Sequence, residues 1–283
     1  MLDHDIVSCA VRAALEEDLG TGDITSRAVI EPGARARGSI VARQRCVVAG
    51  LGVAREVFRQ VDPAVVFEEL VPEGDLAQAG ESVARVTGPA RAILAGERTA
   101  LNFLQRMCGI ATTTRRLVSL ASGSTATICD TRKTVPGLRA LDKYAVRIGG
   151  GTNHRAGLFD AILIKDNHWR LAGGIAEAVR RARSAATGAA GETLPVEVEV
   201  GTIDELREAL AARAEAVLLD NMDPSTLEQA VALGRGRALL EVSGGVDEGD
   251  IPRLAALGVD RISLGALTHS VRAADLALEL GAA

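Results

Sequence analysis

Cationic side chains gather in one stretch of the chain, residues 130–168. Its most polar parts read DTRKTVPGLR, GGGTNHR and LIKDNH, and it holds seven Lys/Arg against four Asp/Glu, a local charge of +3 in a chain of net charge -5. All three lysines of the chain lie here, Lys133, Lys143 and Lys165, whereas the other 29 of the 32 basic residues are arginines. Because arginine supplies the positive charge in the rest of the chain, a lysine at a given position indicates a need for a compact point charge or a reactive amine. The stretch predicts a pocket for a small anion.

Five cations in this stretch are candidates for the anion site. They lie in loops among glycine and proline residues: Arg132, Lys133, His154, Arg155 and Lys165. Arginine suits bidentate recognition of carboxylate or phosphate, and several converging cations need a multiply charged anion to offset their repulsion. Lys165 has an alternative role as a Schiff-base amine, as in aldolases. Lys143 lies in a helical pattern and is expected to be an ordinary residue.

Carboxylates that could balance these cations follow in two later strand patterns. Glu197 and Glu199 are two residues apart, so in a strand both point to one face while Val196, Val198 and Val200 point to the other. Buried carboxylates need cations or a metal nearby. Glu199 and Asp220 are therefore candidates to hold sugar hydroxyls, to bind Mg²⁺ through water, or to stabilise a developing positive charge. The alternative is a structural ion-pairing role.

Two glycine-rich turns, in EVSGGV and ISLGALTHS, each precede a helical pattern. Backbone N–H groups at such turns bind phosphate without side-chain charge, and barrel enzymes often place this site after their last two strands. Ser243, Gly244 and Gly265 are therefore candidate phosphate ligands, and His269 could add a donor. The alternative is that the glycines only permit tight turns and that His269 is a capping or surface residue.

The elements that must position these residues follow a strand–helix rhythm from about residue 125. Apolar strand patterns occupy residues 126–130, 161–165, 195–200, 216–220, 238–243 and 261–265. Nearly every one ends in a polar or glycine residue, and the third carries Glu197 and Glu199 near its end. The active sites of α/β barrels lie at the C-terminal strand ends. The candidates are therefore expected to converge on one face. Six strands are fewer than a complete barrel has, which leaves a distorted barrel or an open sheet.

Residues before about 110 show a different, α+β pattern. Helical patterns at 5–19 and 52–61 are interspersed with strand patterns at 38–48, 65–71 and 83–86. A long helical pattern over 91–107 is expected to end at Gly109, since glycine weakens a helix. In this context Arg98 is a routine helical residue.

Composition excludes several classes of protein. A chain of 283 residues, 47% hydrophobic and 24% charged, is typical of a globular protein with one large or two smaller domains. The acidic balance argues against nucleic acid as a partner, and no apolar run approaches the roughly 18 residues of a membrane span. The four cysteines form no CxxC pair, which predicts free thiols in a cytoplasmic protein rather than a zinc site. The start, MLDHDIVSC, lacks the features of a signal peptide.

Ordered motifs along nearly the whole chain resemble the quinolinate phosphoribosyltransferase family. Besides the cationic stretch and the glycine turns they include EDLGTGDITS (17–26), GERTALNFLQRMCGIAT (96–112), VEVEV (196–200) and LLDNM (218–222). The resemblance implies an N-terminal α+β open-sandwich domain of residues 1–110, joined by a C-terminal helix of residues 271–283. It further implies a catalytic domain of residues 111–270 that forms an incomplete, TIM-like α/β barrel.

The resemblance also implies the reaction and the site. Quinolinate and phosphoribosyl pyrophosphate would become nicotinate mononucleotide, pyrophosphate and CO₂, with Mg²⁺, in the cytoplasmic synthesis of NAD. The catalytic residues would be Lys133, Lys165, Glu199 and Asp220, the last two facing the metal. The substrate anions would be held by Arg132, His154, Arg155 and the two lysines, and the 5′-phosphate by Ser243, Gly244, Gly265 and His269. The family forms dimers or larger oligomers, so Arg98 would act in the neighbouring subunit's site.

Three other functions stay open from the residues alone. The first is a Schiff-base sugar-phosphate lyase that uses Lys165. The second is a non-catalytic protein that binds a small anion on the same scaffold. The third is a related transferase that acts on another pyridine or purine-like acceptor.

Overall fold

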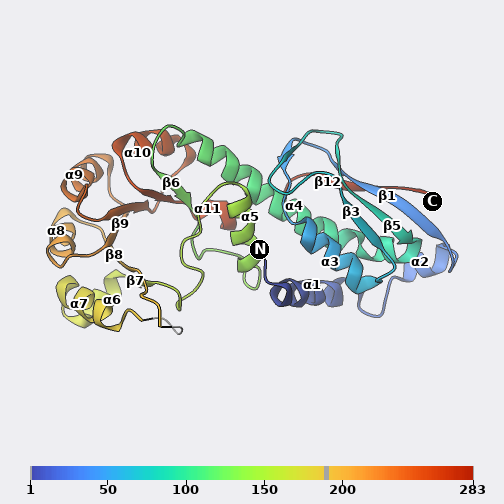
Figure 1. The fold of residues 1–283 in the computed structure, drawn as a ribbon, viewed down its shortest axis with the longest axis horizontal. Coiled ribbons are helices and arrows are strands. Elements are labelled where there is room, and N and C mark those ends of the chain that lie inside the picture. Colours follow the sequence, from blue (N-terminus) through green and yellow to red (C-terminus); the bar gives the residue numbers. More distant parts are fainter. Residues whose placement is uncertain (1, 188–190, 283) are drawn as a thin grey trace. The chain divides into compact units, whose positions relative to one another are not determined.

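The chain folds into two compact units (Figure 1). The structure is a computed structural model that describes residues 2–187 and 191–282. Unit 1 is formed by the described residues of Met1–Arg115, Thr134–Gly150 and Ala266–Ala283, and unit 2 by those of Arg116–Lys133 and Gly151–Gly265. The two units therefore interleave along the chain, and each is described by itself below.

An antiparallel sheet with the strand order β12-β1-β5-β3 forms the centre of unit 1. The strands are β1 (Arg35–Ala42), β3 (Val66–Glu69), β5 (Ser82–Pro89) and β12 (Leu276–Ala282), and a second, two-stranded sheet pairs β2 (Cys46–Val47) with β4 (Leu76–Ala77). Residues Val83, Ala84 and Val86 of β5 are buried, as is Ile40 of β1. Strands β1, β2, β3 and β5 match the patterns read from the sequence, whereas β4 lies in a segment without a clear strand pattern and β12 in one expected to be helical.

The C-terminal residues form a strand, so the expected helix over 271–283 is wrong. β12 pairs with β1 along its length, from Leu276 opposite Ala42 to Ala282 opposite Ala36. Gly38 permits this pairing, because a Cβ there would lie 2.6 Å from Leu280 Cδ2 and 2.9 Å from Glu279 O. The LALEL segment has a composition that favours helix, and pairing with a distant strand overrides that local preference.

Helices complete unit 1, and aspartate side chains cap the first two of them. They are α1 (His4–Leu19), α2 (Ile24–Val29), α3 (Leu51–Val61), α5 (Arg139–Ile148), α11 (Ala266–His269) and most of α4 (Ala90–Leu120). Asp3 accepts the N–H groups of Asp5 and Ile6 at the start of α1, and Asp23 accepts that of Ser26 in α2. No helix within residues 2–187 and 191–282 has the length and apolar character that a membrane crossing requires.

Helix α4 continues through Gly109, so the expected break there is wrong. The glycine is instead a point of close approach, because a Cβ at Gly109 would lie 2.3 Å from Arg272 O. Hydrogen bonds fix the crossing chain: Ala274 N donates to Gln105 O at 2.8 Å, and Gln105 Nε2 donates to Leu276 O at 2.8 Å. The missing side chain thus lets the segment that leads into β12 lie against the helix.

Unit 2 is a curved parallel sheet with helices along its outer side (Figure 1). The strand order is β6-β11-β10-β9-β8-β7, and within the described residues six strands take part: β6 (Thr127–Cys129), β7 (Ile162–Ile164), β8 (Val196–Val200), β9 (Ala216–Asp220), β10 (Leu239–Ser243) and β11 (Arg261–Ser263). The helices are α6 (Asp166–Ala172), α7 (Ile175–Ala185), α8 (Ile203–Ala211), α9 (Pro224–Gly234), the 3-10 turn η1 (Glu248–Asp250) and α10 (Ile251–Leu257). The predicted barrel-like α/β fold with six strands is confirmed.

The strand register puts the polar residues on the inner face of this sheet. Val196, Val198 and Val200 are 0–2% exposed on the helix-covered side, whereas Glu197 and Glu199 point the other way. In the strand register, Glu197 of β8 pairs with Ala216 of β9, and Glu241 of β10 pairs with Leu218 of β9. Carboxylates from β8 and β10 therefore share one face, at neighbouring levels.

Candidate active site

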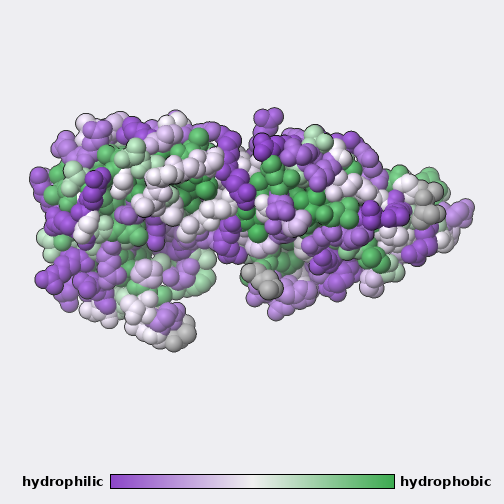
Figure 2. Space-filling view, turned by 45° about the horizontal axis from the view of Figure 1, so that its top comes forward, coloured by the Kyte–Doolittle hydropathy of each residue, from purple (hydrophilic) through white to green (hydrophobic). Residues whose placement is uncertain are grey.

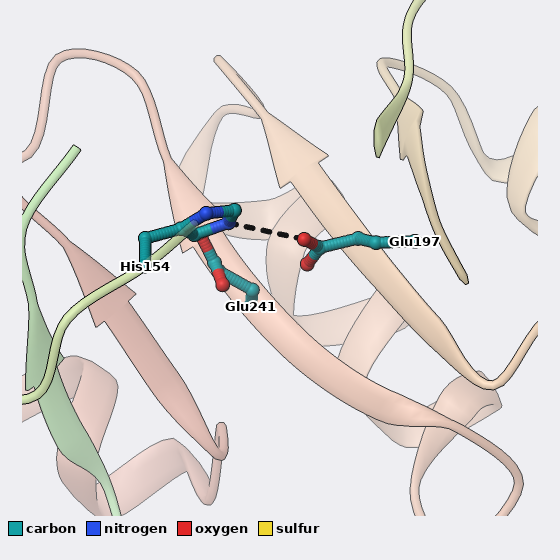
Figure 3. Close-up of side chains that lie close together, drawn as sticks. All are labelled: His154, Glu197 and Glu241. Carbon is teal, nitrogen blue, oxygen red and sulfur yellow. Dashed lines mark hydrogen bonds and ion pairs between the residues drawn. The ribbon is translucent and has the colours of Figure 1, made fainter. Parts of the chain in front are cut away.

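One histidine and two glutamates meet inside the barrel-like sheet of unit 2 (Figure 3). His154 Nε2 lies 3.1 Å from Glu197 Oε2 and 3.4 Å from Glu241 Oε1. The exposed fractions of the side chains are 11% for His154, 8% for Glu197 and 0% for Glu241. Polar contacts shielded from water in this way are stronger than those at a surface. The buried strand carboxylates therefore have a polar partner, as expected of buried acidic groups.

Glu241 is a member of this cluster that the sequence did not single out. Ser263 Oγ donates a hydrogen bond of 2.6 Å to Glu241 Oε1, and Arg261 Nη1 lies 3.9 Å from Glu241 Oε2. Burial first, and then the charge of Glu197, raise the pKa of Glu241 to about 7 against the opposing effects of His154, Ser263 and Arg261. Its signal in the sequence was a lone acidic residue within an apolar strand, LLEVS, which has to have partners.

Asp130 fixes the segment that carries His154. This carboxylate is 0% exposed; its Oδ1 accepts the backbone N–H of His154 at 2.8 Å, and its Oδ2 accepts Nδ2 of Asn153 at 2.6 Å. An isolated bridge pairs Thr152 with Cys129 of β6, so the segment runs beside the edge strand of the sheet. The strand end at Asp130 therefore positions the basic residues of the GGGTNHR motif.

Arg132 and Arg155 form a cationic pair next to the cluster. The backbone N–H of Arg155 donates to His154 Nδ1 at 2.7 Å. Burial and then the neighbouring charge of Arg132 lower the pKa of Arg155. Arg132 Nε is buried and has no hydrogen-bond partner among the described residues. Two adjacent guanidinium groups, one with an unused donor, match a carboxylate or phosphate ligand.

Lys165 contacts Glu199 across the ends of β7 and β8. Its Nζ forms an ion pair with Glu199 Oε2, and 46% of the lysine side chain is exposed. An ammonium group held by a carboxylate favours the point-charge interpretation over a neutral Schiff-base amine. Lys133 is exposed after β6, where its backbone N–H donates to Thr131 Oγ1 at 3.0 Å.

The ends of β9 and β10 place Asp220 beside the first glycine turn. Asp220 is level with Ser243, and the backbone N–H of Asn221 donates to Ser243 O at 3.1 Å. Gly244 has φ +84°, and a Cβ there would lie 2.5 Å from Asn221 Oδ1, so this position requires glycine. A cavity of about 170 Å³ is lined by the turn, with Met222 and Arg253 at its sides.

Ten of the predicted site residues belong to unit 2, and two belong to unit 1. Eight of the ten end or follow strands of the barrel-like sheet, and His154 and Arg155 lie in the loop between α5 and β7. The ten are Arg132, Lys133, His154, Arg155, Lys165, Glu199, Asp220, Ser243, Gly244 and Gly265. Arg98 lies in the part of α4 that belongs to unit 1, and His269 ends α11, where its Nδ1 lies 2.6 Å from Ser270 Oγ. Their roles stay predictions.

Lys143 is not the ordinary residue that its helical pattern suggested. It lies in α5 and only 4% of its surface is exposed. Next to it, the buried Asp142 binds both Nε and Nη2 of Arg106, at 2.8 and 2.7 Å, and Arg106 also donates to Thr268 O at 3.0 Å. This ion pair joins α4, α5 and α11 within unit 1.

The side chains that are spaced for a metal ion differ from the side chains expected at magnesium, Glu199 and Asp220. Within the described residues, the group of three side chains spaced for a metal is His154, Glu197 and Glu241, with ligand atoms within 4.8 Å of one another. His154 does not suit that role, because its Nδ1 accepts an N–H and its Nε2 therefore carries the proton that faces the carboxylates. Glu199 and Asp220 offer the oxygen atoms that Mg²⁺ prefers, and such ions usually keep several waters.

The fold and its similarity to solved structures define a class: an enzyme with an α/β barrel-like domain, whose basic residues and paired carboxylates lie at the strand ends and on the inner face of the sheet. The chain belongs to the quinolinate phosphoribosyl transferase family. The family's C-terminal domain matches residues 110–279, and its N-terminal domain matches residues 23–108.

Individual relatives agree over nearly the full length. The probable nicotinate-nucleotide pyrophosphorylase [carboxylating] of Bacillus subtilis is 44% identical over 93% of this chain and 90% of its own. The corresponding protein of Mycobacterium leprae is 44% identical over 98% of both chains. The structure of the nicotinate-nucleotide pyrophosphorylase from Francisella tularensis has a TM-score of 0.93 and 42% identity, and covers 99% of this chain and 98% of its own.

Proposed function

We propose that this chain catalyses decarboxylating phosphoribosyl transfer in NAD biosynthesis, from phosphoribosyl pyrophosphate to quinolinate. The observation that carries the proposal is the pair Arg132 and Arg155, partly buried beside the His154 cluster, in a chain with 44% identity to named enzymes of this type. Quinolinate is a dicarboxylate, so it supplies the two negative charges that this pair lacks. His154 belongs to the same site, which binds the carboxylates of quinolinate.

The chemistry needs charge stabilisation more than proton transfer. The ring nitrogen of quinolinate attacks C1 of the ribose, and the bond from C1 to the pyrophosphate oxygen breaks with its electron pair. Glu199 and Asp220 stabilise the positive charge that develops on the ribose. Lys133 and Lys165 offset the charge on the departing pyrophosphate, and the pocket holds the two anionic substrates together.

Decarboxylation follows from the cationic ring. The bond between C2 and its carboxylate breaks, CO₂ leaves, and the electron pair stays on C2, next to the positively charged nitrogen. A proton from solvent then completes nicotinate mononucleotide. The arginine pair orients the dicarboxylate while the bond from the ring nitrogen to C1 forms. Once that bond has formed, the ring is positively charged and loss of the carboxylate at C2 follows.

Magnesium and phosphate sites belong to the same proposal. Glu199 and Asp220 would hold Mg²⁺ through water, and the ion would offset charge on the pyrophosphate. Ser243, Gly244 and Gly265, with His269, would bind the 5′-phosphate through backbone and side-chain donors. The 170 Å³ cavity beside Gly244 supports this assignment.

We also propose a homodimer or larger oligomer in which Arg98 completes the site of the neighbouring subunit. The support is the family's shared-site organisation together with the location of Arg98 on α4, outside the barrel-like unit. A cytoplasmic location fits the buried free thiols Cys46, Cys108 and Cys129, since reducing compartments preserve such thiols.

The acceptor is tested by comparing quinolinate with nicotinate. Purified protein with phosphoribosyl pyrophosphate and Mg²⁺ should form nicotinate mononucleotide from quinolinate and none from nicotinate, measured by chromatography. Turnover of nicotinate with no turnover of quinolinate would assign the chain to a different transferase.

A further inference from the structure

Glu241 is buried at the centre of unit 2 without touching any of the cationic residues proposed to bind substrate, apart from His154. It accepts a hydrogen bond from Ser263 and lies between Arg261 Nη1 at 3.9 Å and His154 Nε2 at 3.4 Å. A 0% exposed carboxylate is costly unless its partners are fixed. Its retention in an otherwise apolar strand indicates a role that a hydrophobic residue could not serve.

The hydrogen bonds of His154 determine its tautomer. Its Nδ1 accepts the backbone N–H of Arg155, so that nitrogen has a lone pair, and Nε2 carries the proton. The Nε2–H donates to Glu197 at 3.1 Å (Figure 3), and Nε2 lies 3.4 Å from Glu241 Oε1. Both ring nitrogens therefore have partners in the protein.

This arrangement connects the carboxylates to the backbone of Arg155. The carboxylates orient the Nε2–H edge of the ring, which turns the Nδ1 edge toward the Arg155 N–H. Asp130 fixes the other side of the same residue by accepting the His154 N–H at 2.8 Å. The start of the loop that bears Arg155 is thus held from two directions.

We propose that Glu241 is a positioning residue that, together with Glu197, fixes the His154 ring and through it the orientation of Arg155. The inference rests on the proposed function, in which Arg155 binds a carboxylate of quinolinate. It gives His154 the further role of supporting the arginine. Loss of one such positioning contact should weaken dicarboxylate binding roughly tenfold.

The test is a double-mutant cycle on kinetic constants, using Glu241→Gln and His154→Asn. Glu241→Gln keeps the volume and an oxygen for Ser263 but removes the charge. It should raise the KM for quinolinate about tenfold and change the KM for phosphoribosyl pyrophosphate by less than about twofold. In the His154→Asn background the same change should raise the KM for quinolinate by less than about twofold, because the connecting ring is gone.

Two further variants separate positioning from general stability. Ser263→Ala removes one hydrogen bond from Glu241 and should raise the KM for quinolinate in the same direction, by a smaller factor. Glu56→Gln changes another buried, ion-paired glutamate, which binds Arg59 in unit 1, and should leave both KM values unchanged.

The outcomes distinguish the inference from the proposed function. No quinolinate turnover by the wild-type protein would overturn the proposed function itself. Turnover by the wild type, with the full tenfold effect of Glu241→Gln retained in the His154→Asn background, would overturn the positioning role alone. So would equal changes in both KM values, or an effect of Glu56→Gln as large as that of Glu241→Gln.

Discussion

The Lys165 ammonium and the Glu199 carboxylate form an ion pair that joins the ends of two neighbouring strands, β7 and β8. Nearly half of the lysine side chain is exposed, so the pair contributes little to folding, at most about 1 kcal/mol. Its location, at the C-terminal edge where barrel enzymes bind substrate, indicates a functional reason for the contact. The pair holds both charges ready for a substrate that can displace one of them.

Replacing this lysine should separate activity from stability. Lys165→Met should lower kcat/KM by on the order of a hundredfold or more, since a cation aimed at developing charge is lost. Thermal unfolding should shift little. Arg180→Met, which removes the exposed pair with Glu177, is the matched control and should change neither quantity. A Lys165→Met protein with near-normal kcat/KM would contradict the proposed role.

The buried Glu241 should make stability depend on pH. Its pKa is raised from 4.5 to about 7 in the folded protein, so the folded state retains the proton that the unfolded state loses in this range. The free energy of unfolding of the wild type should therefore fall, relative to Glu241→Gln, as the pH rises from about 4.5 to about 7, by roughly 3 kcal/mol at most. Denaturant unfolding of both proteins at several pH values measures this. A constant difference, or one of opposite sign, would show that Glu241 titrates normally.

Gly109 should tolerate no side chain. A Cβ there would meet Arg272 O at 2.3 Å, so Gly109→Ala should reduce the free energy of unfolding by about 1–3 kcal/mol. Gly52→Ala is the control, since that glycine is also helical but has no atom within 4 Å of the added carbon. It should be neutral or stabilising by up to about 1 kcal/mol. Equal effects of the two substitutions would argue against the close approach at α4.

Thiol reactivity should divide the four cysteines. Cys9 is exposed, whereas Cys46, Cys108 and Cys129 are buried. Burial raises the pKa of Cys129 to about 12, and a hydrogen bond that the Cys108 thiol donates to Cys46, together with burial, raises the pKa of Cys108. A thiol reagent should therefore modify one cysteine per chain quickly in the native protein and all of them after unfolding. Rapid modification of a second cysteine in the native state would contradict the described packing.

Arg98 should act across a subunit interface. Arg98→Ala and Lys165→Ala should each be inactive, and a one-to-one mixture that exchanges subunits should recover about a quarter of the wild-type activity. Half of the dimers are then mixed, and each mixed dimer has one intact site of two. Failure to recover activity, with subunit exchange confirmed, would show that Arg98 acts in its own subunit or not at all.

Much of the fold was readable from the sequence because its signals are local. The six barrel strands are short apolar runs, and Lys165, Glu199, Asp220 and Ser243 were found because they end or follow such runs. Non-local pairing explains what was missed. The last strand looks helical by composition, and Gly109 looks like a helix break, until the crossing of Arg272 and the pairing with β1 are known.

What the sequence did not reveal depends on strand register and packing. Glu241 was hidden within an apolar strand, and only the alignment of β8, β10 and β11 brings it to Glu197, His154 and Ser263. Lys143 looked ordinary because burial of one helix face depends on what packs against it. Arg98 gave no chemical signal in its own context, and its role comes from the family pattern alone.

The central claim is that one site joins ribosyl transfer to loss of the 2-carboxylate. Quinolinate labelled with carbon-13 in that carboxylate, incubated with the protein, phosphoribosyl pyrophosphate and Mg²⁺, tests it most directly. The account predicts labelled CO₂ and pyrophosphate in equal amounts, with unlabelled nicotinate mononucleotide as the product. Pyrophosphate released without labelled CO₂, or a nucleotide that retains the label, would contradict it.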